Sequence, residues 1–426
     1  MAIGNNVLPY APLTTACLCL TLMPAGCERA APRIEPAQTQ PTESTSSPLR
    51  PVHVLVCSDA GRFRIRSGSS ILFTGSGDAT PVTLAPDTWH DGSLLENGVH
   101  VLIHGAPRML PARFEATHGA PLQLDCVGSG ATAPARWYPG AMVLQAGAPN
   151  TLEIVNEVGV ERYVASVVAG ELPTGFDRET LRVGAIVART FVLDQMHRRN
   201  RAGYDVGTGQ GSQVYLGVVA TPAGRAARRA AADTYGLVCT WHDAAGDHLF
   251  PAYYSSVCGG VSQSAGMFGQ SDDVPPLRGG VRCDFCKIAP QRAYRWGPVE
   301  IALSEVYARL LPKVARIASL GGIVGVRVAK RTRHGRPLKI QLDGVSGASV
   351  ELLAERFRLA LGSAIVKSTQ FDLSVDDGTL VFRNGRGFGH GLGLCQWGAE
   401  GQARAGKSAG EILRYYYPGT RVTRVY

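Results

Sequence analysis

The chain has 426 residues, of which 45% are hydrophobic and 18% charged, and its formal net charge is +9 at pH 7. This length and composition exclude a disordered or fibrous protein and leave room for more than one folded domain. The lysines and arginines are spread along the chain without a dense basic run or a nucleic-acid motif, so no nucleic-acid partner is expected. The excess of positive charge would suit an anionic polymer, or would merely keep the surface soluble.

The N-terminus resembles an export signal. An apolar stretch from Val7 to Met23 leads to small residues and Cys27, which is typical of a site where the cysteine is lipidated and becomes the new N-terminus. No lysine or arginine precedes the apolar stretch, and Pro24 stands where such sites usually carry leucine. The sequence therefore predicts a signal over residues 1–27 and an exported protein of the cell envelope, with lipidation at Cys27 left open. Contact with a membrane is expected only through that anchor.

Two regions that differ in composition follow, residues 28–50 and residues 51–150. Residues 28–50 are rich in proline, threonine, serine and glutamine and predict a disordered linker. Residues 51–150 predict a small β-rich unit, because short apolar runs alternate with glycine, serine, aspartate and asparagine turns. The expected strands are Val52–Val56, Phe63–Ile65, Ile71–Phe73 and Val99–Ile103.

Residues 151–426 mix helical and strand patterns without regular alternation, so the predicted fold class is α+β. A strand over Thr151–Val155 leads into a helix ending near Glu171, and a second helix runs from the N-cap Asp177 to about His197. The remaining expected elements are helices over 225–234, 300–311 and 350–361, and a hairpin over 324–342 that turns at His334-Gly335-Arg336.

The helix that ends at Glu171 carries an anomaly. Its apolar residues recur at the three- and four-residue spacing of one face, and the same count reaches Glu171, so a carboxylate stands where a core residue belongs. Pro173 should end the helix there, because proline lacks a backbone donor and disfavours helical geometry in the residue before it. Apolar surroundings and the negative end of the helix dipole both favour a protonated carboxyl, which makes Glu171 a candidate general acid. The alternative is a loose helix end from which Glu171 reaches solvent. The apolar residues of the face are Val160, Tyr163, Val164, Val167 and Val168.

A glycine-rich stretch over residues 385–399 is the second unusual feature. Alternate glycines remove side chains from one side of a strand, which indicates that a ligand or another backbone comes close. His390, Gln396 and Trp397 supply a titratable ring, an amide and a flat apolar face, a combination that suits a sugar chain. A glycine-rich corner with a packed tryptophan is the alternative.

Several motifs in one order resemble the SpoIID/LytB family, which comprises the sporulation stage II protein D and the amidase enhancer. The resemblance extends from about residue 136 to the C-terminus. The motifs are Glu171-Leu172-Pro173, Ala188-Arg189-Thr190-Phe191, Ser212-Gln213-Val214-Tyr215-Leu216-Gly217, Ser256-Val257-Cys258-Gly259-Gly260, Gly389-His390-Gly391, Gln396-Trp397-Gly398-Ala399 and Tyr416-Tyr417-Pro418-Gly419-Thr420.

The resemblance implies a peptidoglycan lytic transglycosylase with a SpoIID-like catalytic domain over 151–426. Such an enzyme cleaves the bond between N-acetylmuramic acid and N-acetylglucosamine, prefers strands stripped of stem peptides, and leaves 1,6-anhydro ends, in cell-wall remodelling or sporulation. It needs one acid, matched by Glu171, and no cofactor, whereas ordinary glycosidases need two carboxylates. The residues expected to line or support the glycan cleft are Arg189, Gln213, Tyr215, His390, Gln396 and Trp397.

The other half of the family name gives a second hypothesis. The protein would then be a non-catalytic peptidoglycan-binding partner that stimulates an N-acetylmuramoyl-L-alanine amidase.

Two departures from the family pattern bear on the cleft. Gly184 stands where the family usually has glutamine, and Cys395 where it usually has serine.

Three cysteines raise the question of a metal. Cys283 and Cys286 have metal-ligand spacing and Cys258 lies close enough in sequence to join them. Some relatives bind a structural zinc with cysteine and histidine in this region, but Ser255 stands where their histidine would be, which leaves three thiolates one ligand short. A disulfide between Cys258 and Cys286 is the alternative in an exported protein.

Overall fold

The computed structural model describes residues 49–96, 98–128, 135–148, 150–198, 203–209, 211–268 and 274–426. The predicted signal with Cys27, and the linker up to residue 48, lie outside the described residues. None of the helices in the described part of the chain is long and apolar enough to cross a membrane.

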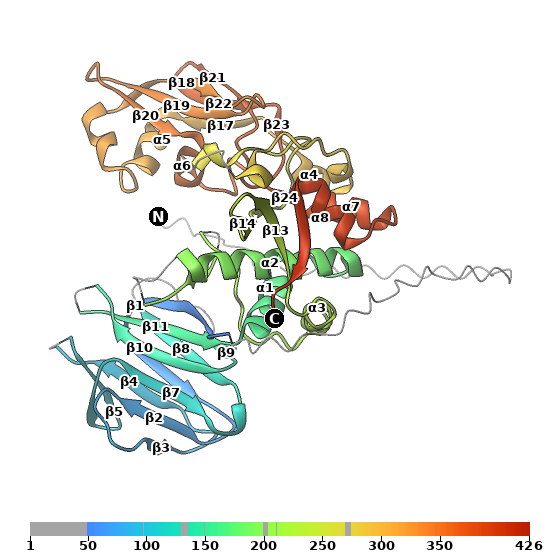
Figure 1. The fold of residues 1–426 in the computed structure, drawn as a ribbon. Helices are drawn as coiled ribbons and strands as arrows, with labels where there is room; N and C mark the ends of the chain where they lie inside the picture. The colour runs from blue at the N-terminus through green and yellow to red at the C-terminus, as the bar shows by residue number, and fades with distance from the viewer. Residues whose placement is uncertain are drawn as a thin grey trace, which may run out of the picture. The chain divides into compact units, whose positions relative to one another are not determined.

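A twelve-stranded sheet occupies the N-terminal part of the described chain (Figure 1). Its main path runs β3-β2-β7-β10-β11-β1-β4-β5-β6; β8 and β12 pair with β1, and β9 with β8. The long strand β1 shifts register between Leu55 and Ala60, and so pairs with β11 along its first half and with β4 and β8 along its second. The strands are β1 (Val52–Arg66), β2 (Ile71–Gly75), β3 (Val82–Leu84), β4 (His90–Leu94), β5 (His100–Ile103), β6 (Ala106–Met109), β7 (Ala112–Ala116), β8 (Leu122–Gly128), β9 (Arg136–Tyr138), β10 (Ala141–Ala146), β11 (Leu152–Val158) and β12 (Val206–Gly207).

Three helices follow the sheet: α1 (Val160–Glu171), α2 (Arg178–Arg198) and α3 (Pro222–Asp233). The predicted apolar face of α1 is buried and joins the core of the sheet. Asp177 begins α2 as predicted, since its Oδ1 accepts a hydrogen bond from the backbone of Glu179 at 2.8 Å. Helix α2 is buried on two sides, one in the sheet core and one in the core of the C-terminal elements.

A second hydrophobic core lies in the C-terminal part of the chain. The elements around it come from residues 237–294 and from residues 394–424. Strand β13 pairs with β14 and with the C-terminal β25, and the short strands β15 and β24 form a parallel pair. These elements are β13 (Leu237–Asp243), β14 (Gly246–His248), β15 (Tyr254–Ser255), α4 (Gln291–Tyr294), β24 (Leu394–Cys395), α7 (Gln396–Arg404), α8 (Ala409–Tyr416) and β25 (Thr420–Arg424).

A third core lies between residues 295 and 386, where two three-stranded sheets meet two helices. The predicted hairpin is confirmed, because β18 and β19 pair up to a turn over residues 332–336. The helices predicted over 300–311 and 350–361 start later than expected, since the first residues of each segment pair as strands β17 and β20. The elements are β16 (Arg295–Trp296), β17 (Val299–Ala302), α5 (Leu303–Leu310), β18 (Ile323–Arg331), β19 (Pro337–Gly344), β20 (Ser349–Leu353), α6 (Ala354–Leu361), β21 (Asp372–Asp376), β22 (Thr379–Arg383) and β23 (Gly385–Arg386). The 3-10 helices of the described chain are η1 (Thr117–Gly119), η2 (Ala265–Phe268), η3 (Pro275–Leu277), η4 (Phe285–Ile288) and η5 (Ala315–Leu320).

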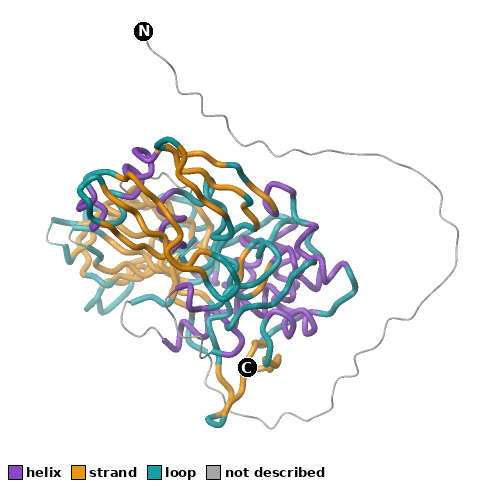
Figure 2. The backbone as a smooth tube through the Cα atoms, turned by 90° about the horizontal axis from the view of Figure 1, so that it is seen from above, coloured by secondary structure: helices purple, strands orange, loops and turns teal. Residues whose placement is uncertain are grey.

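The predicted α+β class is confirmed. Figure 2 shows helices and strands gathered in separate regions instead of alternating along one sheet. The boundary placed at residue 150 falls inside the large sheet, since β11 and β12 continue it, and residues 48–426 form one compact unit.

Candidate active site

Glu171 is the last residue of α1, and its side chain lines a cleft of about 540 Å³. The helix ends where Pro173 predicts, with the backbone N–H of Leu172 donating to Val168 as the last hydrogen bond. Glu171 is therefore held at a fixed helix end and is neither fully buried nor free in solvent. The other residues around the cleft are Phe191, Gly211, Ser212, Val214, Tyr253, Tyr254, Ser255, Ser256, Glu355, Arg358, Leu359, Ser363, Phe388, Gly389, His390 and Gln396.

Burial raises the pKa of Glu171 above its ordinary value, in the direction expected for an acid catalyst. Three contacts oppose this effect because they favour the ionised carboxylate. The backbone N–H of Val214 donates to Glu171 Oε1 at 2.8 Å, and Tyr254 and Gln396 contribute smaller effects of the same sign. Burial favours the protonated carboxyl of Glu171 and the hydrogen bonds favour its carboxylate. Glu171 can therefore both donate a proton and accept one.

A glycine lets the segment that carries Val214 come this close. A Cβ on Gly170 would lie 2.6 Å from the carbonyl oxygen of Val214. The same segment is held a second time, since the backbone N–H of Leu216 donates to Ser166 Oγ at 3.0 Å. The motif at 212–217 thus serves to bring one backbone N–H against the carboxyl of Glu171.

The parallel pair β15 and β24 forms another wall of the site. It pairs Tyr254 with Leu394 and Ser255 with Cys395, so Tyr254 and Gln396 arrive beside Glu171 from segments far apart in sequence. The Gln396 side chain also donates to the backbone carbonyl of Glu171 at 3.4 Å. Tyr254 has no motif signal beyond its place two residues before Ser256, and sequence reasoning missed it.

Three buried polar atoms around Glu171 make no hydrogen bond of good geometry within the described part of the chain. They are the Tyr254 hydroxyl, Ser255 Oγ and Gln213 Nε2. Buried polar groups are normally satisfied, and leaving one unpaired costs about 1–3 kcal/mol. Ser255 lines the cleft, so its Oγ is available to a hydroxyl or amide group of a ligand, whereas Tyr254 already contacts Glu171 and Gln213 lies outside the lining.

Gln213 and Tyr215 support the cleft and do not line it. Gln213 Oε1 accepts from the Tyr163 hydroxyl at 2.9 Å, and the Tyr215 hydroxyl donates to Asn156 Oδ1 at 2.6 Å. The rings of Tyr163 and Tyr215 stack with centroids 5.3 Å apart. This buried network fixes α1 against the strand β11 and the motif at 212–217.

Arg189 lies away from the cleft lining, with its guanidinium fully buried. It forms a two-pronged ion pair with Glu161, at 2.8 and 2.6 Å, and donates to the carbonyls of Leu237 and Ala231 at 2.9 and 3.3 Å. The partners join α1, α2, α3 and β13, so the side chain holds these elements together. Of the two expected roles, lining or supporting the cleft, this position is compatible with support alone.

His390 and Trp397 lie at two different places. His390 lines the cleft, where burial lowers the pKa of its ring to about 4 and Nδ1 accepts from the backbone N–H of Leu392 at 3.0 Å. Trp397 is outside the cleft lining and packs edge-on against Phe176, with ring centroids 4.9 Å apart. Trp397 is thus engaged in packing against Phe176 and is not among the residues that line the cleft.

The cleft has a second carboxylate, Glu355, which is buried and held by Arg358. The two side chains form a two-pronged ion pair with contacts of 2.9 and 2.5 Å. Neutralised in this way, Glu355 lacks the freedom of a nucleophile or base. Among the residues described around the cleft, Glu171 is the carboxyl without a cationic partner.

Gly184, the first departure from the family pattern, lies beside a small gap behind Glu171. A cavity of about 20 Å³ is lined by Gly184, Glu171, Tyr254 and apolar side chains. A Cβ on Gly184 would lie 2.7 Å from Leu172 Cδ1, so Leu172 fills the space that a larger side chain would need.

The second departure, Cys395, lies in a buried cluster of four cysteines. Its Sγ and those of Cys258, Cys283 and Cys286 all lie within 4.8 Å of one another. Cys258 and Cys286, the predicted disulfide pair, have their sulfur atoms 3.8 Å apart. The cluster joins the loop after β15, the 3-10 helix η4 and strand β24, directly before Gln396.

The fold and the site together define an α+β protein with one uncompensated carboxyl in a cleft that has room for sugars. Residues 148–241 match the family model for SpoIID, stage II sporulation protein. The chain is 28% identical over 286 residues to stage II sporulation protein D of Bacillus subtilis, covering 63% of this chain and 76% of that protein. It is 26% identical over 353 residues to stage II sporulation protein D of Bacillus amyloliquefaciens, covering 77% and 94%. It is 36% identical over 75 residues to the amidase enhancer of Bacillus subtilis, covering 18% and 10%.

The family model and the named relatives together support the SpoIID/LytB family for this chain.

Proposed function

We propose that this protein acts on the cell wall as a peptidoglycan lytic transglycosylase with Glu171 as its acid and base. The observation that carries the proposal is the state of Glu171, a carboxyl with a raised pKa in a cleft whose other carboxylate, Glu355, is held by an arginine. One free carboxyl is insufficient for a hydrolase that uses an acid and a separate base or nucleophile, but it is sufficient for a transglycosylase.

The chemistry needs a proton to leave Glu171 and return. The protonated carboxyl donates to the glycosidic oxygen between N-acetylmuramic acid and N-acetylglucosamine, and the C1–O bond breaks. The carboxylate, now stabilised by the N–H of Val214 and by Tyr254, accepts the proton of the muramic 6-hydroxyl as that oxygen bonds to C1. The product is a 1,6-anhydro sugar, and neither water nor a cofactor is consumed.

The neutral His390 and the unpaired Oγ of Ser255 would meet the hydroxyl and acetamido groups of the sugars. A neutral ring can donate from one nitrogen and accept at the other, whereas a charged ring can only donate. Gln396 would hold the end of α1 in place through its hydrogen bond to the Glu171 carbonyl.

The test is Glu171→Gln in the full chain. Glutamine keeps an oxygen that can accept from Val214, so the fold should persist while the transferable proton is lost. Cleavage of peptide-stripped glycan strands, followed by mass spectrometry of 1,6-anhydromuramic ends, should fall by about 10²–10⁴-fold. Glu153→Gln is the matched control, since Glu153 lies on β11 and accepts a hydrogen bond from Gln145 outside the cleft. Reducing ends in place of anhydro ends would refute the mechanism.

The second candidate is a peptidoglycan-binding partner that stimulates an N-acetylmuramoyl-L-alanine amidase. It is favoured by the similarity of 75 residues to a protein named amidase enhancer. Enhancement requires binding and no acid chemistry, so Glu171→Gln should then leave amidase stimulation unchanged. Wild-type protein that binds strands and produces no anhydro ends would support this candidate over the first.

The proposed substrate implies a protein outside the cytoplasmic membrane, in the cell envelope. The apolar stretch from Val7 to Met23 supports the proposal that Cys27 carries a lipid anchor. Partitioning of the full chain into a detergent phase tests the anchor. Wild-type protein should partition with the detergent and Cys27→Ser should remain in the aqueous phase. Equal partitioning of the two would refute lipidation.

A further inference from the structure

The short strands β16 and β23 place two arginines directly opposite each other. In their antiparallel register Arg295 pairs with Arg386, and Trp296 pairs with Gly385. Like charges at opposed positions destabilise a strand pair. The arginine pair, Arg295 and Arg386, therefore calls for an explanation other than the stability of these strands.

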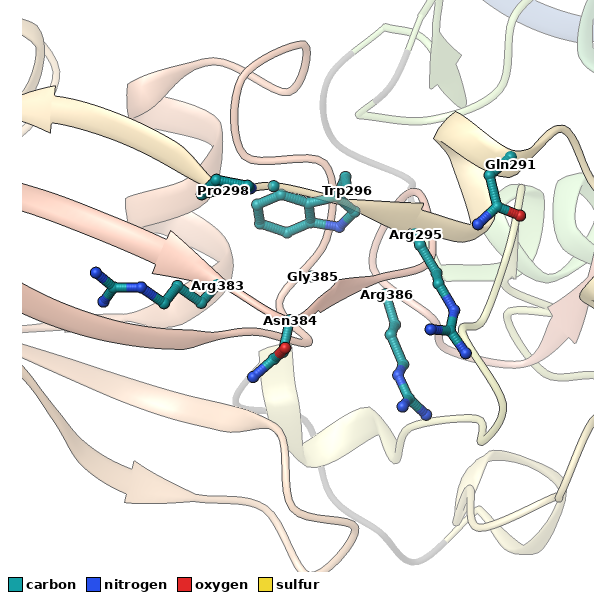
Figure 3. Close-up of a pocket in the computed structure, with 9 residues that line it drawn as sticks. Gln291, Arg295, Trp296, Pro298, Arg383, Asn384, Gly385 and Arg386 are labelled. Carbon is teal, nitrogen blue, oxygen red and sulfur yellow. The ribbon is translucent and has the colours of Figure 1, made fainter.

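Both members of the arginine pair are exposed and line a hollow of about 530 Å³. Neither guanidinium has a hydrogen-bond acceptor or a carboxylate partner within the parts of the chain that the structure describes. Figure 3 shows the two side chains extending in the same direction, whereas Arg383 of the same hollow points the other way. Two positive charges thus stand side by side without a counter-charge.

The nearby strand β21 carries two aspartates, but both have other partners. Asp372 accepts a hydrogen bond at 3.0 Å from Asn384, which lines the hollow, and lies 3.7 Å from Arg331. Asp376 forms an ion pair with Arg383 at 3.0 Å. The acidic residues that could have neutralised the arginine pair are therefore bound to different arginines.

The backbone that carries the arginine pair is held in place. The N–H of Arg386 donates to the carbonyl of Gln370 at 2.9 Å, and the Arg386 carbonyl accepts from Ser368 Oγ at 2.5 Å. The buried ring of Trp296 packs over Gly385, where a Cβ would overlap the ring. Because the two side chains start from a fixed base, less conformational freedom is lost when they bind a ligand.

The hollow lies next to the cleft of Glu171 along the chain. Arg386 lines the hollow, and Phe388, two residues later, lines the cleft. Two residues span at most about 7 Å. A polymer held at Glu171 can therefore continue into the hollow.

We infer that the arginine pair binds a lactyl carboxylate of the glycan strand outside the cleft. Each N-acetylmuramic acid presents this carboxylate once its stem peptide has been removed, whereas N-acetylglucosamine has no charged group. The planar donors of a guanidinium match the two oxygens of a carboxylate. In a strand that keeps its stem peptides the same carboxyl is tied up in an amide bond, so the hollow favours stripped strands. This inference rests on the proposed substrate, the glycan strand, and does not require that the protein cleave it.

Calorimetric titration of the full chain with soluble peptide-stripped strands tests the site. Binding is measured in Glu171→Gln protein, the parent, so that the strands stay intact. Adding Arg295→Gln and Arg386→Gln to the parent should weaken binding by ~10-fold at low salt and reduce its salt dependence, because exposed ion pairs are individually weak and are screened by salt. Both side chains are exposed, so the fold should persist, which circular dichroism verifies. Unchanged strand binding would refute the inference and leave the proposed function standing.

The matched control adds Arg331→Gln and Arg383→Gln to the parent. It removes the same charge from two exposed arginines that already have aspartate partners. This control should bind stripped strands nearly as tightly as the parent does. An equal loss of binding in the two sets of variants would overturn the inference, because net charge alone would then explain the effect.

Two further ligands identify the group that is bound. Stripped strands whose lactyl carboxylates have been converted to amides should bind with the same affinity whether or not the arginine pair is present. Intact strands carry carboxylates only on their stem peptides, and a ~10-fold loss with these strands as well would overturn the assignment to the lactyl group. Failure of the parent to bind stripped strands would refute the proposed substrate and this inference with it. Wild-type protein that binds strands through the arginine pair without cleaving them would refute only the transglycosylase activity.

Discussion

Replacing Arg189 by methionine should destabilise the protein without altering the cleft. Methionine keeps part of the apolar stem but loses both contacts to Glu161 and the hydrogen bonds to two buried carbonyls. Removing one partner of a buried ion pair costs about 3–5 kcal/mol. The Glu161 carboxylate is 25% exposed and keeps the Tyr426 hydroxyl at 2.6 Å, which places the expected loss near the lower end of this range.

The loss can be converted into a shift of the melting temperature. At ~2.1 cal/mol/K per residue, unfolding of residues 48–426 changes the entropy by ~0.8 kcal/mol/K, so a loss of ~3 kcal/mol in Arg189→Met should lower the Tm by ~4 °C. Differential scanning calorimetry measures the shift. Arg182→Met is the control, because Arg182 lies on the same helix in a half-exposed pair with Glu179 that contributes only ~0.2–0.5 kcal/mol.

The folded Arg189→Met variant should bind glycan strands as tightly as wild type does, because Arg189 lies outside the cleft lining. An unchanged Tm would show that the buried ion pair contributes no stability. Weakened glycan binding at a temperature where Arg189→Met is fully folded would restore Arg189 to the cleft and refute the structural role.

Three further predictions concern the carboxyl and its surroundings. Tyr254 favours the ionised form of Glu171, so Tyr254→Phe should raise the pKa of Glu171 and move the alkaline limb of the rate–pH profile to higher pH; a limb that stays in place would argue against the contact. Burial lowers the pKa of His390 to about 4, so its ring signals in NMR spectra should not titrate between pH 5 and 8, and a midpoint in that interval would contradict its burial. Gly170→Ala places a Cβ 2.6 Å from the carbonyl oxygen of Val214, so chemical denaturation should show a free energy of unfolding lower by ~1–3 kcal/mol, and glycan cleavage should be slower. Wild-type values for both would show that the segment carrying Val214 can move away at no cost.

The sequence predicted those features that depend on neighbours along the chain. The helix ending at Glu171 follows from apolar residues three and four apart and from Pro173, and both signals lie within fourteen residues. The α+β class follows in the same way from the mixture of periods. The helices predicted over 300–311 and 350–361 began too early. The first residues of these segments pair with β22 and β19, and this pairing across the sheet overrode the helical period.

Features that depend on distant partners were missed or misplaced. Tyr254 contacts Glu171, and Cys395 clusters with cysteines more than one hundred residues earlier in the sequence. Neither residue therefore has a local sequence signal. Arg189 was expected to line or support the cleft because its motif resembles the family's, and its buried pairing with Glu161, 28 residues away on another helix, has no local signal. No periodicity along one segment can predict such a pair.

The hydrogen bond between Gln396 and the end of α1 has a consequence for the newly made chain. Glu171 leaves the ribosome 225 residues before Gln396 does, and the wall formed by β15 and β24 cannot close until residue 395 has emerged. During that interval the carboxyl lacks both the pocket that raises its pKa and the contacts that hold it. Under the proposed function, the site assembled in this order is inert throughout synthesis and becomes active only when nearly all of the chain is available to fold.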